Sequence, residues 1–474
     1  MIHHRNYYDA VVVGAGPNGL AAAITLINKF KSVLLLEAKG TIGGGVRSAE
    51  LTLPAFIHDI CSAVHPLAIS SPFFRQLELH RYGLTWIQPD IPLAHPFKDG
   101  SALYLHRSLE VTCSALGPDG TAYKDLLAPF VKNHEKLLSD ILAPIHFPKN
   151  PFLMTRFAMN ALGSVKNLVS AKFQREQTRA LFAGIAAHAM MPLEKPATAA
   201  FGIVLATLAH AVGWPIIAGG SQKLANALAE HFRQNRGEIV TGKPVYSVND
   251  LPKAKFYFFD VTPRQLLNIE GLGLSDSYRR KLARFRYGPG VCKVDWALRE
   301  PIPWKADICK KAGTVHLGNS YEEIDASIRH AGKGKMYSSP YVVIAQQSLF
   351  DSSRAPEGKH TAWAYCHVPQ GSAEDIAIRI EDRIEQYAPG FREIIIARNS
   401  MSAAAMELYN PNYVGGDING GVQDLRQLYT RPVISLCPYR TSEKNIYICS
   451  SSTPPGGGVH GLCGYYAARA ACKS

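Results

Sequence analysis

The N-terminal part of the chain alternates between short apolar runs and one stretch of helical periodicity. Residues 9–13 (DAVVV) form a continuous run rich in β-branched side chains, which is typical of a strand buried on both faces of a parallel sheet. Apolar residues then recur at helical spacing from Leu20 to Phe30, and a second buried run, residues 33–36 (VLLL), ends at Glu37. The pattern therefore predicts a βαβ unit close to the start of the chain.

Later segments return to an α/β pattern after a long helical region. Helical periodicity dominates residues 101–214, whereas residues 219–248 predict a turn, an amphipathic helix and a strand. Residues 291–304 alternate as in a strand with one packed face. Residues 197–222 contain no Asp, Glu, Lys or Arg, but Pro215 and several glycines interrupt this run. We therefore expect a buried helix there and not a membrane span, which needs about 20 uninterrupted apolar residues.

Composition adds constraints on partners and compartment. The 474 residues are enough for two domains, and 51 Lys and Arg against 38 Asp and Glu give a formal net charge of +13. The basic residues are scattered, and there is no zinc-finger spacing or RNP-like aromatic strand, so no nucleic-acid partner is expected. The nine cysteines form no CxxC pair, so we expect reduced thiols and no metal site. With no secretion signal before the first strand, the sequence predicts a cytoplasmic protein.

Three glycines mark the turn between the first predicted strand and helix. Gly14, Gly16 and Gly19 form a G-x-G-x-x-G pattern, in which the glycines permit a tight turn, close approach of a pyrophosphate and close helix packing. Pro17 suits the first turn of the helix, whose N-terminal N–H groups attract phosphates. Glu37 follows the second strand, where a carboxylate accepts hydrogen bonds from a ribose and repels a 2′-phosphate. An adenine dinucleotide of the NAD or FAD type is therefore predicted, and NADP is disfavoured.

Two further glycine turns favour FAD. The segment Gly43–Arg47 resembles the second glycine turn of the FAD-binding motif in the amine oxidase and phytoene desaturase superfamily. Residues 452–468 (STPPGGGVHGLCGYYAA) resemble the flavin-contacting signature of phytoene dehydrogenase-related oxidoreductases, and residues 351–363 (DSSRAPEGKHTAW) also fit this family. The resemblance spans the whole chain and is nearest to the branch of the pyridine nucleotide-disulfide oxidoreductase domain 2 proteins.

This resemblance implies an α/β fold with FAD as the cofactor. A Rossmann-type FAD-binding domain is expected from the discontinuous segments 1–100, 215–268 and 430–474, and an inserted α+β substrate domain from 101–214 and 269–429. N–H groups beside the C-terminal glycines would face the negative charge of a reduced flavin. The implied FAD-binding residues are Gly14, Ala15, Gly16, Pro17, Asn18, Gly19, Glu37, Ala38, Gly44, Gly45, Arg47, Gly457, Gly458 and Val459.

No side chain is an obvious catalytic base. His460 stands where the desaturase pattern commonly has a proline, and a histidine near the flavin is a candidate for proton transfer, although a structural role is the more common one. Asp59 and His65 are weaker candidates. Desaturation does not require a side-chain base if the substrate cation loses its proton otherwise.

Three functions remain open at this stage. The first is an FAD-dependent dehydrogenase that removes hydride from a lipophilic substrate to flavin N5 and leaves a double bond, as in phytoene desaturases. The second is a flavin amine oxidase, in which Tyr465 and Tyr466 would form part of an aromatic cage. The third is a catalytically silent FAD-binding interaction or regulatory protein, because cofactor binding does not establish a reaction.

A basic segment raises the question of membrane contact. Between Phe152 and Arg175, four Lys and Arg residues stand among Leu, Phe and Met, a composition that suits a peripheral membrane helix as well as a packed surface helix. The packed helix is slightly favoured by the pattern. A lipophilic small-molecule substrate, reached from a membrane, is the partner that the family resemblance implies.

Overall fold

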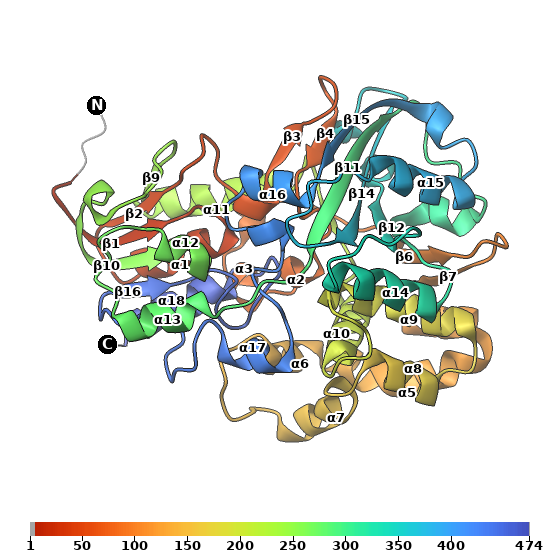
Figure 1. Cartoon of the computed structure of the whole chain (residues 1–474), viewed down its shortest axis with the longest axis horizontal. Coiled ribbons are helices and arrows are strands. Elements are labelled where there is room, and N and C mark those ends of the chain that lie inside the picture. Colours follow the sequence, from red (N-terminus) through yellow and green to blue (C-terminus); the bar gives the residue numbers. More distant parts are fainter. Residues whose placement is uncertain (1–4, 474) are drawn as a thin grey trace.

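The computed structural model describes residues 5–473 and contains two large β-sheets (Figure 1). The first sheet has five strands, all paired in parallel, in the order β16-β10-β1-β2-β9. These strands are β1 (Tyr7–Val13), β2 (Val33–Leu36), β9 (Glu238–Val240), β10 (Lys253–Phe259) and β16 (Ile446–Ile448). With α1 (Pro17–Ile27) between β1 and β2, the predicted βαβ unit and the Rossmann-type α/β architecture are confirmed.

Helices cover both faces of this parallel sheet. On one face lie α1, α11 (Gln222–Gln234) and α18 (Leu462–Ala471), and on the other lie α12 (Pro263–Leu267) and α13 (Asp276–Ala283). Ala10 and Val12 belong to the apolar cluster of the first face, whereas Val11 belongs to that of the second. Because successive side chains of a strand point to opposite faces, a strand buried on both needs the continuous apolar run seen in β1.

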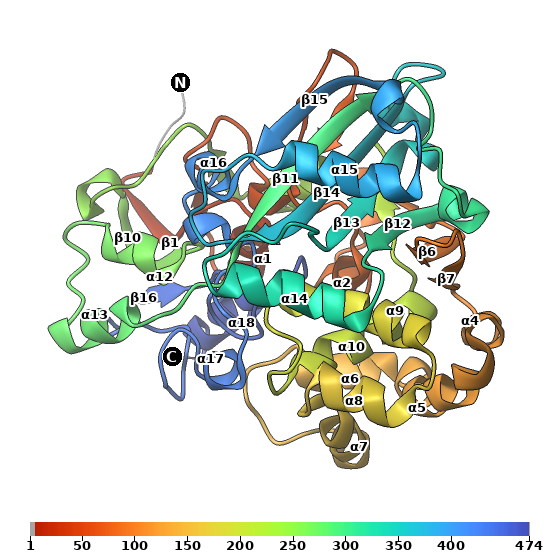
Figure 2. The same cartoon turned by 45° about the vertical axis from the view of Figure 1, so that its right-hand side comes forward.

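The second sheet is mixed and has seven strands in the order β15-β11-β14-β13-β12-β6-β7. Its only parallel pair among the described residues joins β12 to β6. α14 (Tyr321–Gly332) lies between this sheet and a layer of helices, and α15 (Ala377–Tyr387) packs against β11 and β14 (Figure 2). The strands are β6 (Ile91–Pro96), β7 (Ala102–Leu105), β11 (Gly290–Leu298), β12 (Ala312–Leu317), β13 (Val342–Ala345), β14 (His360–Val368) and β15 (Ile395–Met401).

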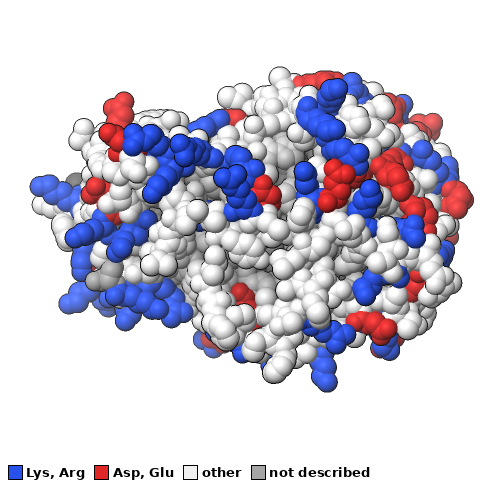
Figure 3. All heavy atoms as spheres, turned by 60° about the horizontal axis from the view of Figure 1, so that its bottom comes forward, with Lys and Arg blue, Asp and Glu red and all other residues white. Residues whose placement is uncertain are grey.

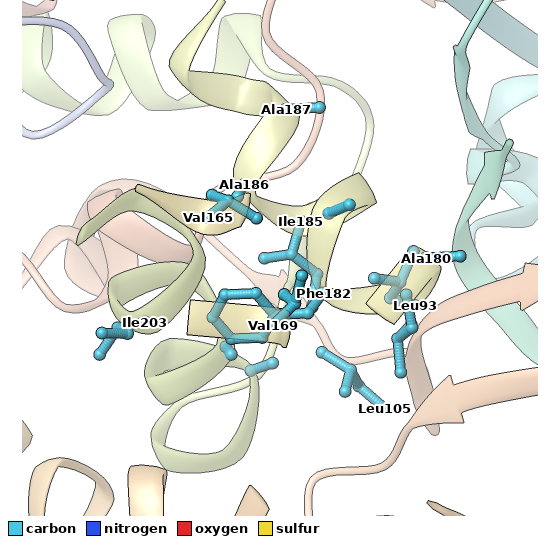
Figure 4. Close-up of a cluster of buried hydrophobic side chains, with 14 of the residues drawn as sticks. Leu93, Leu105, Val165, Val169, Ala180, Phe182, Ile185, Ala186, Ala187 and Ile203 are labelled. Atoms are coloured by element: carbon cyan, nitrogen blue, oxygen red, sulfur yellow. The ribbon is translucent and has the colours of Figure 1, made fainter. Parts of the chain in front are cut away.

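The helical layer forms the lower part of the molecule in Figure 1. Phe182 stands at the centre of its apolar cluster, with Val169, Ile203 and Leu105 close by (Figure 4). A Cβ placed on Gly202 would come within 2.6 Å of the Phe182 ring, so this glycine allows α9 and α10 to pack closely. The helices are α4 (Leu109–Leu116), α5 (Gly120–Lys132), α6 (His134–Ile141), α7 (Pro151–Ala161), α8 (Val165–Lys172), α9 (Glu176–Ala186) and α10 (Thr198–Ala211).

The uncharged segment 197–222 contains a buried helix, as predicted. It contains α10, which ends at Ala211, and the short strand β8 (Ile216–Ile217), which pairs with β5 (Trp86–Ile87). In the span 5–473, no helix has the length and apolarity needed to cross a bilayer.

The residues at which the chain leaves one sheet and joins the other differ in part from the predicted ends of the domain segments, near residues 100 and 268. β6 lies before residue 100 but pairs with β7 and β12, so this strand belongs to the seven-stranded sheet. Leu272 and Leu282 pack in the apolar cluster of β1 and β10, so the chain stays with the parallel sheet beyond residue 268. Both differences come from pairing between segments far apart in the sequence.

Short elements complete the connections. They are β3 (Ser48–Glu50), β4 (Ile57–Asp59), α2 (Pro66–Ile69), α3 (Pro72–Arg75), α16 (Ala403–Tyr409) and α17 (Leu425–Thr430). β3 and β4 form a hairpin that lies next to the second sheet in Figure 1.

Candidate cofactor and substrate site

The turn after β1 has the geometry that its glycines predict. Gly14 has a φ of +102°, and its N–H donates to the Leu36 carbonyl at 2.7 Å. A Cβ on Gly19 would stand 1.8 Å from the Gly14 carbonyl oxygen, so only glycine allows α1 to approach β1 this closely. Gly16 precedes α1, and Pro17 occupies its first turn. The first turn of α1 therefore faces an open cavity lined by Gly14, Gly16, Pro17 and Asn18.

Glu37 is held rigidly at the end of β2. Its carboxylate accepts hydrogen bonds from the Ala15 N–H and the Lys39 N–H, each at 2.9 Å, and from Arg47 Nη2 at 3.0 Å. Arg47 also donates to the Thr41 carbonyl. Glu37 and Ala38 line the cavity, so the carboxylate stands where the sequence predicts a ribose contact, and Arg47 fixes its orientation.

The second glycine turn packs directly against the first. Gly44 has a φ of +52°, and a Cβ on it would stand 3.0 Å from Gly16 Cα. A Cβ on Gly45 would come within 2.7 Å of the Tyr413 hydroxyl oxygen. Gly44, Gly45 and Arg47 line the same cavity as the turn after β1.

The C-terminal glycine turn lines another part of this cavity. Gly457, Gly458 and Val459 are lining residues, and Gly458 has a φ of +121°. The structure thus brings the predicted cofactor-binding segments, which are separated by up to hundreds of residues in the sequence, onto one continuous surface. Ala15 and Gly19 are not lining residues, and they shape the turn through their backbone.

His460 lies behind the cavity wall. The ring is fully buried, its Nδ1 accepts a hydrogen bond from the Leu462 N–H at 3.0 Å, and Nε2 has no partner among the described residues. Burial lowers the pKa of His460 to about 4, so the ring is neutral near pH 7. Since His460 is not a lining residue of the cavity, its catalytic role stays a prediction that the geometry does not favour.

The cavity has a volume of about 880 Å³ and extends from the glycine turns into the helical layer. Beyond the flavin-side turn its wall is mainly apolar and aromatic, which suits a lipophilic molecule. The lining residues of this second part include Met154, Phe157, Met190, Phe201, Val204, Leu205, Trp214, Val343, Trp363 and Tyr365.

A histidine on the apolar wall of the cavity lies next to a second, fully buried histidine. His188 lines the cavity, its Nε2 lies 3.4 Å from Nε2 of His316, and its Nδ1 lies 3.2 Å from the Tyr365 hydroxyl oxygen. Burial lowers the pKa of His188 to about 4, and it lowers the pKa of His316 still further. This cluster could not be predicted from the sequence, because its members come from three separate segments.

Asp260 is a second residue that sequence reasoning missed. It follows β10 directly, lines the cavity, and its Oδ2 accepts a hydrogen bond from the Gly19 N–H at 2.8 Å. Burial raises the pKa of the Asp260 carboxyl to about 7. An acid therefore stands beside the predicted phosphate-binding turn.

A buried ion-pair network supports the cavity from behind. Arg354 donates to Asp59 Oδ2 at 2.9 Å and to Asp351 Oδ2 at 3.0 Å, and the Arg354 and Asp59 side chains are fully buried. Burial by itself would raise the pKa of Asp59, but Arg354 and the Ser221 N–H hold it below its usual value. Asp59 therefore has a structural position, whereas His65 lines the cavity and its Nε2 bonds the Ser221 hydroxyl at 2.8 Å.

Comparison with known proteins finds relatives over the N-terminal turn and over the whole chain. Residues 12–77 match the family model of an NAD(P)-binding Rossmann-like domain. The mouse pyridine nucleotide-disulfide oxidoreductase domain-containing protein 2 is 25% identical, and the alignment covers 97% of this chain and 92% of the mouse protein. The chain is thus similar, along nearly its whole length, to a protein named for an oxidoreductase domain.

Solved structures share the fold of the whole chain. An oxidoreductase from Methanosarcina mazei superimposes with a TM-score of 0.66 at 16% identity, covering 98% of this chain and 100% of that protein. A putrescine oxidase variant superimposes with a TM-score of 0.62 at 16% identity, covering 98% of each chain. The predicted α/β fold agrees with these comparisons.

Proposed function

We propose that this protein is an FAD-dependent dehydrogenase that introduces a double bond into a lipophilic substrate, in the manner of phytoene desaturases. The observation that carries the proposal is the continuity of the cofactor cradle with an apolar, aromatic cavity. Bound FAD supplies a hydride acceptor at its N5 atom. The substrate loses hydride from one carbon and a proton from the neighbouring carbon, so that both electrons of the broken C–H bond leave and the second C–H bond becomes the double bond.

The chain's own contribution is to position the substrate and to receive the proton. Trp214, Trp363 and Tyr365 offer flat apolar surfaces for an extended hydrocarbon. His188 is neutral at pH 7, because burial lowers its pKa to about 4, and a neutral imidazole can accept a proton at the cavity surface. Its contacts with His316 and Tyr365 fix the orientation of the ring.

Amine oxidation is the second candidate, supported by the fold shared with putrescine oxidase. The predicted aromatic cage of Tyr465 and Tyr466 does not line the cavity, since Tyr465 packs on Phe73 with ring centroids 5.1 Å apart. Of the three acids that line it, Glu37 and Asp260 lie at the cofactor turns, and Asp140 is engaged by His146 and by backbone N–H groups. A protonated amine therefore lacks a free carboxylate in the described apolar wall, which favours an uncharged substrate.

The decisive measurement is the visible spectrum of the purified protein under anaerobic conditions. We expect a flavin band that bleaches when a lipid extract of the host is added, because a hydride donor in the extract reduces the cofactor. Bleaching by primary amines and not by lipids would support amine oxidation instead. A flavin band that neither lipids nor amines bleach would support a silent FAD-binding protein.

We also propose that the protein docks on a membrane with the mouth of its cavity. Five exposed apolar side chains, here called the apolar rim, stand on α7 and on the loops beside it. Ile145 and Leu162 of this rim also line the cavity, so the rim and the cavity mouth are continuous. Figure 3 shows a hollow on this side of the molecule, surrounded mainly by uncharged side chains. The rim consists of Ile145, Phe147, Phe152, Met159 and Leu162, which are 73%, 85%, 91%, 74% and 48% exposed.

Basic residues near the apolar rim suit an anionic bilayer. Lys149 and Arg156 are exposed between rim residues, and Lys166 and Lys172 are exposed on the neighbouring helix α8. A helix with exposed aromatic side chains and lysines at its edges binds the interface of membranes that contain anionic lipid. A lipophilic substrate could then enter the cavity from the bilayer without crossing water.

Removing two rim side chains should weaken membrane binding. We expect the double variant Phe147→Ser, Phe152→Ser to bind vesicles of phosphatidylcholine and phosphatidylglycerol at least about tenfold more weakly, because each aromatic ring loses apolar burial in the interface. Co-sedimentation with vesicles measures this. Leu408→Ser is the matched control, since Leu408 is 82% exposed on α16, away from α7 (Figure 1). Equal binding by all three proteins would contradict the docking proposal.

A further inference from the structure

Asp260 stands close to the turn that should receive the cofactor's phosphates. Its Oδ2 lies 2.8 Å from the Gly19 backbone nitrogen, and a Cβ built on Gly16 would lie 2.9 Å from the same oxygen. The side chain is one of the cavity-lining groups, together with Gly16 and Asn18. The carboxyl group therefore faces the first turn of α1 from the end of β10.

This position affects the hydrogen-bond donors of the helix. Pro17 has no N–H, and the Gly19 N–H is already used by Asp260, so the Asn18 N–H is the one left in the first turn of α1. FAD carries two negative charges on its pyrophosphate. An ionised carboxylate beside that turn would repel the phosphates and occupy a donor that they could use.

The groups around Asp260 do not compensate its charge. Glu37, which is paired with Arg47, adds negative charge and raises the pKa of Asp260, whereas the Gly19 N–H lowers it. The thiols of Cys449 and Cys463 also face it, and burial raises the pKa of each, so both stay neutral. Burial is the largest effect and raises the pKa of Asp260 to about 7.

We propose that Asp260 binds FAD in its protonated form, accepting the Gly19 N–H and donating its own proton to a phosphate oxygen, so that cofactor binding takes up a proton. The proton comes from solvent, and no covalent bond to the cofactor forms. A protonated carboxyl is both an acceptor and a donor, which turns the repulsion into a hydrogen bond. The proposal depends on FAD being the cofactor.

The pH dependence follows from this linkage. Below about pH 6 the carboxyl of the free protein is already protonated, so binding needs no proton and affinity is constant. As the pH rises through 7 the free protein ionises, whereas the FAD complex keeps the proton. The dissociation constant for FAD should therefore rise by about tenfold for each pH unit above about pH 7.

Two substitutions at Asp260 distinguish the effect of the bound proton on FAD affinity from the effect of the size and hydrogen bonds of the side chain. Asp260→Asn can accept from the Gly19 N–H and donate from its amide, as the protonated acid does, so it should bind FAD with little pH dependence and more tightly than wild type at about pH 8.5. Asp260→Ala loses both bonds and should bind more weakly than Asp260→Asn at every pH. Asp276→Asn, a change at an exposed acid of α13 that does not line the cavity, should keep the wild-type profile.

The measurement uses the holoprotein dialysed between about pH 6 and pH 9, with released FAD read from its fluorescence. Proton uptake is measured separately, by adding FAD to wild-type apoprotein in weak buffer with an indicator dye, and about one proton per FAD is expected near pH 8. This second measurement needs no variant. Wild-type binding that is independent of pH, or uptake of no proton, would overturn the role of Asp260. Wild-type protein that binds no FAD at any pH would instead overturn the cofactor assignment and the proposal with it.

Discussion

Replacing Gly19 by alanine is expected to abolish FAD binding. The new Cβ would stand 1.8 Å from the Gly14 carbonyl oxygen, so α1 would have to move away from the turn after β1. Moving α1 displaces the N–H groups and the cavity wall that hold the pyrophosphate. Purified Gly19→Ala should contain less than about a tenth of the wild-type flavin, measured as the ratio of absorbance at the flavin band to that of protein.

Gly332→Ala is the matched control for this experiment. Gly332 ends α14, and a Cβ there would meet nothing within 4 Å. Its flavin content should equal that of wild type. If Gly19→Ala also keeps a full complement of flavin, then the turn after β1 is not the phosphate site, whatever its sequence pattern.

Replacing Arg354 by alanine is expected to give the largest loss of stability. The substitution leaves Asp59 and Asp351 without their cation, and Asp59 is fully buried. Breaking one partner out of a buried ion pair typically costs about 3–5 kcal/mol, because a charge is left uncompensated in a region of low dielectric constant. The midpoint of thermal unfolding, compared at a single scan rate, measures the loss.

The surface pair of Arg75 with Glu135 provides the control. Their side chains are 53% and 60% exposed, and an exposed pair contributes about 0–1 kcal/mol. Arg75→Ala should therefore leave the unfolding midpoint almost unchanged. An equal effect of both substitutions would show that the network around Arg354 does not stabilise the junction of the two sheets.

The parts of the site that the sequence predicted are those built by local backbone. Gly14, Gly16 and Gly19 lie within a single turn, and their spacing alone determines which of them must lack a Cβ. The second turn, at Gly44, and the C-terminal turn, at Gly458, are predicted by the family resemblance of their short motifs. Each contains glycines with a positive φ, Gly43 and Gly44 in the second turn and Gly456 and Gly458 in the C-terminal turn.

The parts that the sequence did not predict depend on contacts across the chain. Asp260 bonds Gly19 across 241 residues, and Arg354 bonds Asp59 across 295. No local pattern shows which acid faces which turn. Asp59 is a weak catalytic candidate in the sequence, and Arg354 lies in a segment that resembles the family, but neither observation predicts their ion pair. His460 is an example of a motif residue whose role the sequence did not show correctly. Its place in the motif suggested a position near the flavin, but the ring does not line the cavity and its Nδ1 accepts a hydrogen bond from the Leu462 N–H.

The sequence predicts the segments that contain the lipophilic half of the cavity, but not the individual residues that line it. His188 follows α9, Phe201 stands on α10 and Trp363 on β14, so each is only one apolar or aromatic residue in its own element. A helix that lines a cavity and a helix that packs in a core have the same periodicity. Only the tertiary arrangement distinguishes the two.

The cradle of the cofactor joins segments that are synthesised far apart in time. The turn after β1 lies at residues 14–19, whereas the wall segment 457–459 follows β16. A ribosome-bound chain that has not reached residue 459 lacks β16 or the flavin end of its cavity. Complete FAD loading therefore requires synthesis to have passed this segment.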